Sequence, residues 1–187
     1  MTGIPARPKI YHITHLRNLP QIVTAGRIWS DAKRIELGLE SEIVGMAKIK
    51  RRRLEELEVH CHRGTKVGQY VPFYFCPRSI MLYILHRGNH PDLNYREGQQ
   101  PIVHLQADLL DTVRLANQHG VRWAFSNTNA GARYDGKQAE FLVFESFPWP
   151  LVERIGVASQ AVLQQVQEVL ADVAHQPPAS VEPGWYF

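Results

Sequence analysis

Apolar residues fall in short runs of strand length along the whole chain, and this spacing constrains the fold more than any other feature. The helical patterns between them are also short, and the clearest begins at Ser159 with apolar residues at helical intervals. Short strands mixed irregularly with short helices are typical of an α+β domain rather than a wound α/β sheet. Strands are expected at residues 9–14, 27–29, 71–75, 102–105, 121–125, 139–144 and 151–157. Other helices are expected at residues 15–25, 42–57 and 79–86.

One domain is expected over residues 1–187, because the chain has no internal repeat and no Gly/Ser-rich linker. Hydrophobic residues make up 44% of the chain and charged residues 21%, which indicates a packed core. No apolar run reaches the roughly 18 to 20 residues that a membrane span needs, and the N-terminus does not resemble a secretory signal. Only Cys61 and Cys76 are present, so no disulfide framework is expected. These features indicate an intracellular protein with no membrane partner.

Basic residues concentrate in one short segment, at Lys48, Lys50 and residues 51–53. The formal charge of the whole chain is only +3, so this concentration is more informative than the total. Such a cluster neutralises phosphates and suits a polyphosphate or a nucleic acid. A solvated, positively charged helix face is the alternative, and composition alone favours it.

A carboxylate opens the apolar strand expected at 139–144. Alternation places Glu140 on one face with Leu142 and Phe144, while Phe141 and Val143 occupy the other. An unpaired charge on such an apolar face is costly. Glu140 is therefore expected either to point into a functional site or, at the strand end, to bend towards water or pair with an arginine.

His12 and Thr14 form a second candidate site on the first expected strand. They share one face of the strand, while Tyr11 and Ile13 share the other. An imidazole beside a hydroxyl could form hydrogen bonds with a ribose or an amide. A hydrogen-bonded core histidine is the alternative.

Other familiar sites find little support in the sequence. His60 and His62 flank Cys61, but no second pair at zinc-like spacing accompanies them, so no metal is expected. The chain has no Gly-rich phosphate loop of the common types and no G-x-S-x-G elbow.

Four blocks of the chain, in the same order, resemble the DarT family of bacterial DNA ADP-ribosyltransferase toxins. The blocks are YHITH at 11–15 with NLP at 18–20, IKRRR at 49–53, VPFYFCPRS at 71–79 with MLY at 81–83, and QAEFLV at 138–143. The resemblance extends from about Tyr11 to Val157. Four collinear blocks are far more specific than any single motif.

The resemblance implies a single-domain α+β ADP-ribosyltransferase fold, in which two small, mostly antiparallel sheets form an NAD⁺-binding cleft with helices around it. It implies NAD⁺-dependent mono-ADP-ribosylation of a base in single-stranded DNA, thymidine by default. It also implies a toxin of the bacterial cytoplasm, neutralised by a macrodomain-type antitoxin that removes the modification. Nothing in this chain encodes that partner.

The resemblance also assigns residues to the NAD⁺ site. His12 and Thr14 would lie beside the nicotinamide and its ribose, and Asn18 and Leu19 would help to form the pocket. Arg51, by its position in the basic run, would contact the phosphates and be essential. An arginine fork holds a pyrophosphate bidentately, as a lysine cannot.

Glu140 matches the catalytic glutamate of the family. Loss of nicotinamide builds positive charge on the ribose, which a nearby carboxylate stabilises, and the same carboxylate can take a proton from the attacking base nitrogen. Tyr74 or Phe73 could stack on nicotinamide or on the target base, with core packing as the alternative for either.

The chain departs from the family in one loop. The family is expected to carry a longer insertion before Q-A-E-F-L, whereas only residues 126–137 separate the preceding strand from Gln138. Because this loop should approach the target nucleotide, guanine competes with thymine as the modified base. The residues expected to contact DNA are Arg78, Arg133, Tyr134 and Lys137.

Three other functions stay open on the sequence. One is an NAD⁺-using, RNA-directed transferase such as an RNA 2′-phosphotransferase, which should carry a different block from Q-A-E-F-L. A second is a catalytically silent nucleic-acid-binding module, in which Glu140 would be dispensable. A third is the modification of a protein side chain.

Overall fold

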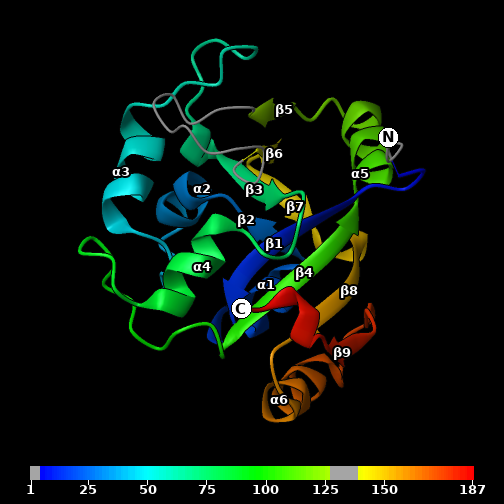
Figure 1. Cartoon of the computed structure of the whole chain (residues 1–187). Helices are drawn as coiled ribbons and strands as arrows, with labels where there is room; N and C mark the ends of the chain where they lie inside the picture. Colours follow the sequence, from blue (N-terminus) through cyan, green and yellow to red (C-terminus); the bar gives the residue numbers. More distant parts are fainter. Residues whose placement is uncertain (1–4, 127–138) are drawn as a thin grey trace.

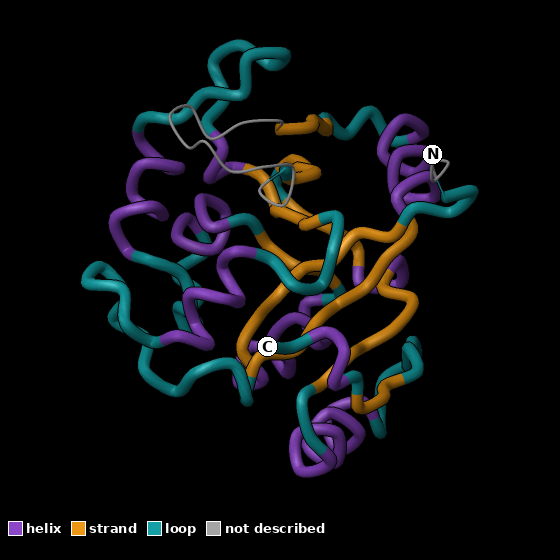
Figure 2. The backbone as a smooth tube through the Cα atoms, in the orientation of Figure 1, coloured by secondary structure: helices purple, strands orange, loops and turns teal. Residues whose placement is uncertain are grey.

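A computed structural model describes residues 5–126 and 139–187. Within these residues the strands form a seven-stranded sheet, ordered β5-β6-β3-β1-β4-β8-β9, and a two-stranded sheet of β2 and β7 (Figures 1 and 2). The large sheet comprises β1 (Lys9–His15), β3 (Tyr70–Tyr74), β4 (Ile102–Asp108), β5 (Trp123–Ser126), β6 (Glu140–Phe144), β8 (Val152–Val157) and β9 (Ala179–Val181). The small sheet comprises β2 (Arg27–Trp29) and β7 (Ser146–Pro148).

Short helices surround the sheets. They are α1 (Leu19–Ala25), α2 (Asp31–Glu36), α3 (Ala47–Glu55), α4 (Ile80–Arg87), α5 (Leu109–Gln118) and α6 (Gln160–Leu170). In Figure 1, α2, α3 and α4 gather on the side of β3, while α6 lies by β8 and β9. Four of the helices have serine or aspartate N-caps whose side chains accept backbone N–H groups: Ser30, Ser79, Asp108 and Ser159.

This architecture confirms the α+β class, although one sheet is much larger than the two small sheets expected from the resemblance. Each expected strand is present; the strand at 27–29 has the expected bounds, and the others differ at one or both ends. The helix expected at 42–57 is shorter and spans Ala47–Glu55. The sequence analysis missed α5, because its N-cap Asp108 is also the last residue of β4 and the strand pattern conceals the helix start.

The large sheet separates two apolar clusters. Alternate residues of β1 divide between them, since Ile10 belongs to the larger cluster and Ile13 to the smaller one. The larger cluster packs α1 and α6 against the sheet, and the smaller one packs α4. Both faces of the sheet's centre are thus covered, which fixes β1 and β3 in place.

The two central strands β1 and β3 part from each other soon after they meet. Their register has one pair, Tyr11 opposite Tyr74, whereas β1 pairs with β4 along all of Lys9–His15. Beyond Tyr11 the His12 imidazole reaches across to the Pro72 carbonyl, with Nδ1 2.9 Å from the oxygen. A side chain here replaces the backbone ladder, and the strands open into a cavity.

Candidate active site

The cavity lies where β1 and β3 diverge. Residues of β1, β2, α2, α3, β3 and β6 line it, together with the segment that leads into α3. Its charged lining residues are three carboxylates and three cations: Asp31, Glu42, Glu140, Arg34, Lys50 and Arg53. Strands from both sheets contribute walls, so the cavity has a rigid frame, and its charged groups stand within a mainly apolar lining.

Glu140 and Arg53 form an ion pair in this cavity. Arg53 Nη1 donates to both carboxylate oxygens of Glu140, at 2.9 Å to Oε1 and 2.8 Å to Oε2. Only 16% of the Arg53 side chain and 12% of the Glu140 side chain is exposed. Glu140 sits at the start of β6, opposite Tyr74 of β3. The expected pairing with an arginine and the expected place in a site are thus both realised.

Arg53 keeps one buried donor without a partner. Its Nη2 makes no hydrogen bond to any part of the chain that the structure describes. Burial acts to lower the Arg53 pKa, but the Glu140 carboxylate outweighs it and the pKa is raised, so the guanidinium stays charged. A buried N–H group is almost always satisfied in a protein. An unsatisfied guanidinium N–H in a cavity therefore points to an anionic or carbonyl-bearing ligand.

Tyr74 completes the wall beside Glu140. Its phenol is buried, and burial together with the nearby Glu140 charge raises the pKa of Tyr74 far above its usual value. The phenol therefore stays protonated at neutral pH and can act as a donor. The structure thus places Tyr74 in the cavity, where the sequence analysis expected a cofactor contact.

His12 and Thr14 also line the cavity. Burial lowers the pKa of His12, so its ring is neutral. Because the Pro72 carbonyl can only accept, Nδ1 carries the proton and Nε2 is left as an acceptor. Thr14 Oγ1 accepts from Asn18 Nδ2 at 3.1 Å.

Asn18 lines the cavity and binds the backbone of Glu42, in the segment before α3. Its amide accepts from the Glu42 N–H at 2.8 Å and donates to the Glu42 carbonyl at 3.0 Å. These bonds hold the segment before α3 against β1. Asn18 thus shapes the pocket, although its amide is already occupied.

Lys50 and Asp31 form a second ion pair in the cavity, with Nζ 2.8 Å from Oδ1. Burial acts to raise the pKa of Asp31, but the charges of Lys50 and Arg34 outweigh it, and the pKa is lowered. Asp31 is therefore ionised and holds Lys50 in place. The lysine adds a second positive charge beside Arg53.

Within the basic run, the structure brings Arg53 and not Arg51 into the cavity. Arg51 does not line the cavity; its side chain is 76% exposed and pairs with Glu55 one turn along α3. Residues two apart on a helix point in nearly opposite directions, so Arg53 faces inwards where Arg51 faces water. Arg52 pairs with Glu56 in the same outward manner. The outer part of the run is thus the solvated helix face that was the alternative.

The other predicted contacts fall in three places. Leu19 is fully buried in the larger apolar cluster and does not line the cavity. Arg78 lies outside the cavity and donates from Nε to the Tyr186 carbonyl at 2.8 Å. Arg133, Tyr134 and Lys137 lie outside the described residues.

Sequence analysis missed Arg53, Lys50 and Asp31 as site residues. A signal for the first two was present, because Met46, Lys50 and Arg53 recur at helical intervals and share the inward face of α3. The run was instead treated as one basic block, without a helix phase. Asp31 follows the N-cap Ser30, so its sequence context suggested a turn or a cap alone.

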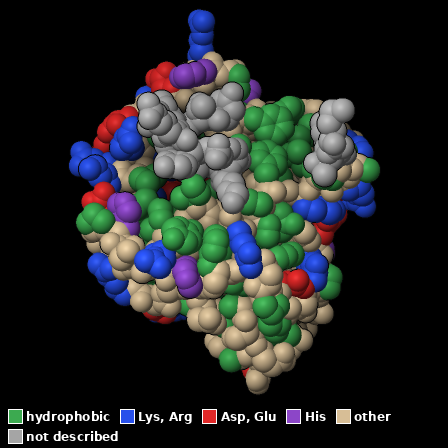
Figure 3. Space-filling model, viewed as in Figure 1, with side chains coloured by type: hydrophobic (Ala, Val, Ile, Leu, Met, Phe, Trp, Pro, Cys, Tyr) green, Lys and Arg blue, Asp and Glu red, His purple; other side chains and the backbone are tan. Residues whose placement is uncertain are grey.

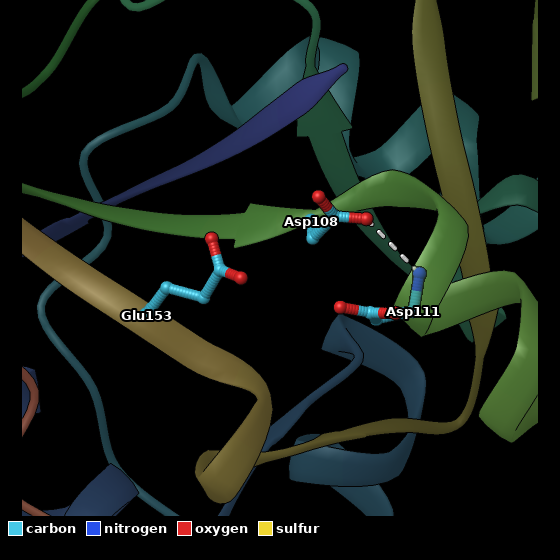
Figure 4. A group of neighbouring side chains, drawn as sticks. All are labelled: Asp108, Asp111 and Glu153. Atoms are coloured by element: carbon cyan, nitrogen blue, oxygen red, sulfur yellow. Dashed lines mark hydrogen bonds between the residues drawn. The ribbon is translucent and has the colours of Figure 1, made fainter. Parts of the chain in front are cut away.

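Away from the cavity, Asp108, Asp111 and Glu153 bring carboxylate oxygens within 4.8 Å of one another (Figure 4). Among the described residues this is the group whose spacing could hold a metal ion. Arg7 pairs with all three carboxylates, and Lys9 pairs with Asp108 and Glu153. The positively charged side chains of Arg7 and Lys9 thus already neutralise these carboxylates.

Comparison with known proteins identifies the class to which this fold and cavity belong. A DNA ADP-ribosyl transferase of Thermus aquaticus is 32% identical over 212 residues, covering 98% of this chain and 90% of that protein. The structure of Thermus sp. 2.9 DarT in complex with ADP-ribosylated ssDNA has a TM-score of 0.84 and 29% identity, over 99% of both chains. Its NAD⁺ complex has a TM-score of 0.77 and 27% identity, over 99% of this chain and 100% of that one. The class is that of the DNA ADP-ribosyltransferases.

A family model described as ssDNA thymidine ADP-ribosyltransferase, DarT, matches residues 11–135 and 132–187. The chain belongs to the DarT family. Among the described residues, no helix combines the length and the apolar character needed to cross a membrane.

Proposed function

We propose that this enzyme transfers ADP-ribose from NAD⁺ to a base of single-stranded DNA, with Glu140 as the catalytic carboxylate and Arg53 as its essential partner. The observation that carries the proposal is the buried Glu140–Arg53 pair, in which Arg53 Nη2 is left without a partner. The NAD⁺ and DNA complexes of the related Thermus sp. 2.9 DarT support it.

The chemistry of the cavity fits NAD⁺. Two cations, Arg53 and Lys50, can neutralise a pyrophosphate, and the free Arg53 Nη2 offers it a hydrogen bond. His12 and Thr14 present a ring acceptor and a hydroxyl, which suit the nicotinamide amide and the adjoining ribose. We propose no metal in this reaction, since the cations of the side chains supply the positive charge.

In the proposed step, the bond between the nicotinamide nitrogen and the ribose C1′ breaks, and nicotinamide leaves with the bonding electrons. The base nitrogen forms the new bond to C1′ and gives its proton to Glu140. The carboxylate also stabilises the positive charge that develops on the ribose. Arg53 holds both oxygens of Glu140, which fixes the carboxylate before the substrates arrive.

Thymidine is the proposed target, and guanosine is the competing one because the loop before Gln138 is short. The loop residues Arg133, Tyr134 and Lys137 are proposed to meet the DNA. We further propose that the enzyme is a toxin of the bacterial cytoplasm, reversed by a macrodomain-type antitoxin.

Intact mass spectrometry of single-stranded oligonucleotides tests this function. Oligonucleotides of different base content are incubated with the enzyme and NAD⁺, beside a Glu140→Gln control. We expect an added ADP-ribose mass that requires Glu140, and fragmentation of the product names the base. No adduct on any DNA, with NAD⁺ still bound, would overturn the DNA target and direct the same assay to RNA and protein.

A further inference from the structure

Two phenylalanine rings form an exposed aromatic pair beside the active site. Phe125 is 54% exposed and Phe75 is 37% exposed. Their ring centroids lie 5.9 Å apart at an interplanar angle of 33°. Two rings of this exposure that lie together form an apolar patch on the surface, and such patches mark interaction sites.

The pair is held rigidly from below. Phe125 contacts the rings of Trp123 and Phe141, with centroids at 5.6 Å and 5.4 Å. It lies on β5, which is an edge strand of the large sheet among the described residues. In Figure 3, hydrophobic side chains gather on the surface in the region of β5.

The loop that carries Phe75 is anchored as well. His104, which is fully buried, lies with Nε2 3.0 Å from the Pro77 carbonyl. Arg78 binds the Tyr186 carbonyl. The two rings are therefore preorganised, and a ligand that contacts them loses little of its binding free energy to ordering the protein.

Register fixes where the pair lies relative to Glu140. Ser126 stands opposite Glu140, and its Oγ accepts the Glu140 N–H at 3.1 Å. The preceding residue, Phe125, stands opposite Phe141. Because neighbouring residues of a strand point to opposite faces, the aromatic pair leaves the sheet on the face opposite to the Glu140 side chain. A base held by Glu140 cannot reach this pair, so an occupant from the same DNA strand has to be a different nucleotide.

We propose that Phe75 and Phe125 form a stacking platform for a base of the single-stranded DNA that flanks the modified nucleotide. This inference rests on the proposed function and adds a determinant of DNA affinity. A nucleobase matches the platform in size and in its planar apolar face, and base–aromatic stacking tolerates different sequences. The platform adjoins the Glu140 site through Ser126, so one DNA strand can engage both.

The test uses Phe125→Leu and Phe75→Leu/Phe125→Leu, which keep apolar packing but remove the aromatic faces. Tyr83→Leu is the matched control, since Tyr83 is 47% exposed and forms an edge-to-face pair with Phe187 at 5.2 Å. Transfer rates are measured against oligonucleotide concentration and against NAD⁺ concentration. A second series replaces each base that flanks the target by an abasic site.

We expect the double variant to raise the KM for DNA about tenfold, while the KM for NAD⁺ and kcat stay close to wild type. With the wild-type enzyme, one flanking abasic site should cause a similar loss, and the double variant should lose no more on that oligonucleotide. An unchanged KM for DNA, or losses that simply multiply, would overturn the platform.

Failure of the proposed function has a different signature. If the wild-type enzyme transfers ADP-ribose to no DNA, binding of fluorescently labelled single-stranded DNA still tests the platform by anisotropy. Weaker binding in the double variant alone supports it, and equal binding in all variants overturns it.

Discussion

Two groups of ion pairs in this molecule consist of the same kinds of charged side chain but differ in whether every buried polar atom has a partner. The strand-end group consists of Asp108, Asp111 and Glu153 around Arg7 and Lys9, and its five ion pairs satisfy the carboxylates from within the chain. It ties the start of β1 to β4, α5 and β8, as Figure 4 shows for the carboxylates. Such a closed network indicates a structural role.

The cavity group consists of Asp31, Lys50, Arg53 and Glu140. Its two ion pairs are largely buried, yet Arg53 Nη2 has no partner among the described residues. Leaving a buried donor unsatisfied costs about 1–3 kcal/mol, which a ligand can recover. An ion-pair network with an unsatisfied buried donor, and not the number of charges, therefore marks the candidate functional site.

The largest expected effect comes from Glu140→Gln. The amide keeps the shape and one acceptor for Arg53 but removes the negative charge that stabilises the developing positive charge on the ribose. Transfer to single-stranded DNA should fall by about 10²- to 10³-fold or more, measured as ADP-ribosylated oligonucleotide per unit time. The variant should also unfold at a lower temperature, because buried Arg53 loses its counter-charge, so activity is compared where both enzymes are folded. Normal activity of Glu140→Gln would remove Glu140 from the mechanism.

A smaller effect is expected from Lys50→Ala. Losing one charge-assisted contact to the pyrophosphate should raise the KM for NAD⁺ about tenfold or more, with less change in kcat. Without Lys50 the pKa of Asp31 should rise, because the charge that lowers it is removed. Steady-state kinetics at varied NAD⁺ measures the effect, and Lys48→Ala, outside the cavity, is the control. Equal KM values for NAD⁺ in both variants would contradict a contact between Lys50 and the pyrophosphate.

The strand-end group should respond in stability and not in catalysis. Asp108 caps α5 by accepting from the N–H groups of Leu110 and Asp111, so Asp108→Ala should lower the free energy of unfolding by about 1–3 kcal/mol. Asp111→Ala, at a carboxylate that is 39% exposed, should change it by about 0.5 kcal/mol or less. Chemical denaturation measures both changes in stability. A loss of transfer activity in folded Asp108→Ala would contradict a purely structural role for the strand-end group.

The contribution of Asp108 to stability should depend on pH. Burial acts to raise the pKa of Asp108, but the hydrogen bond from the Asp111 N–H and the contacts with Lys9 and Arg7 outweigh it, and the pKa is lowered. The carboxylate therefore contributes stability above its ordinary pKa of about 4, and this contribution is lost as the pH falls through the lowered value. The stability difference between wild type and Asp108→Asn should be present at pH 7 and shrink in acid. A difference that grew on acidification would contradict the assignment.

Local patterns in the sequence were sufficient for much of the fold. Alternation in residues 139–144 placed Glu140 correctly, and the apolar runs located each expected strand. The start of α5 was hidden because Asp108 ends β4 and caps the helix at once. The extent of the large sheet also depends on pairings between distant strands, which no local pattern encodes.

The sequence predicted the strand residues that line the cavity, but it did not single out Arg53 of α3. His12 and Thr14 share one strand face, as alternation predicts, and both line the cavity. Tyr74, which was assigned through the resemblance, lines it as well. Arg51 does not line the cavity, because a basic run needs a helix phase before one arginine can be singled out. Arg53 meets Glu140 across 87 residues of sequence, and only the folded chain shows that contact.

Arg53→Lys and Arg51→Lys are compared in one assay of NAD⁺-dependent transfer to single-stranded DNA, because Arg53 lines the cavity and Arg51 does not. Both changes keep the positive charge of the run, but a lysine at 53 cannot hold Glu140 while offering a second fixed donor. The structure predicts that Arg51→Lys stays within about twofold of wild type, since exposed ion pairs contribute little, and that Arg53→Lys loses most of its activity. Loss of activity in Arg51→Lys with retention in Arg53→Lys would contradict the account.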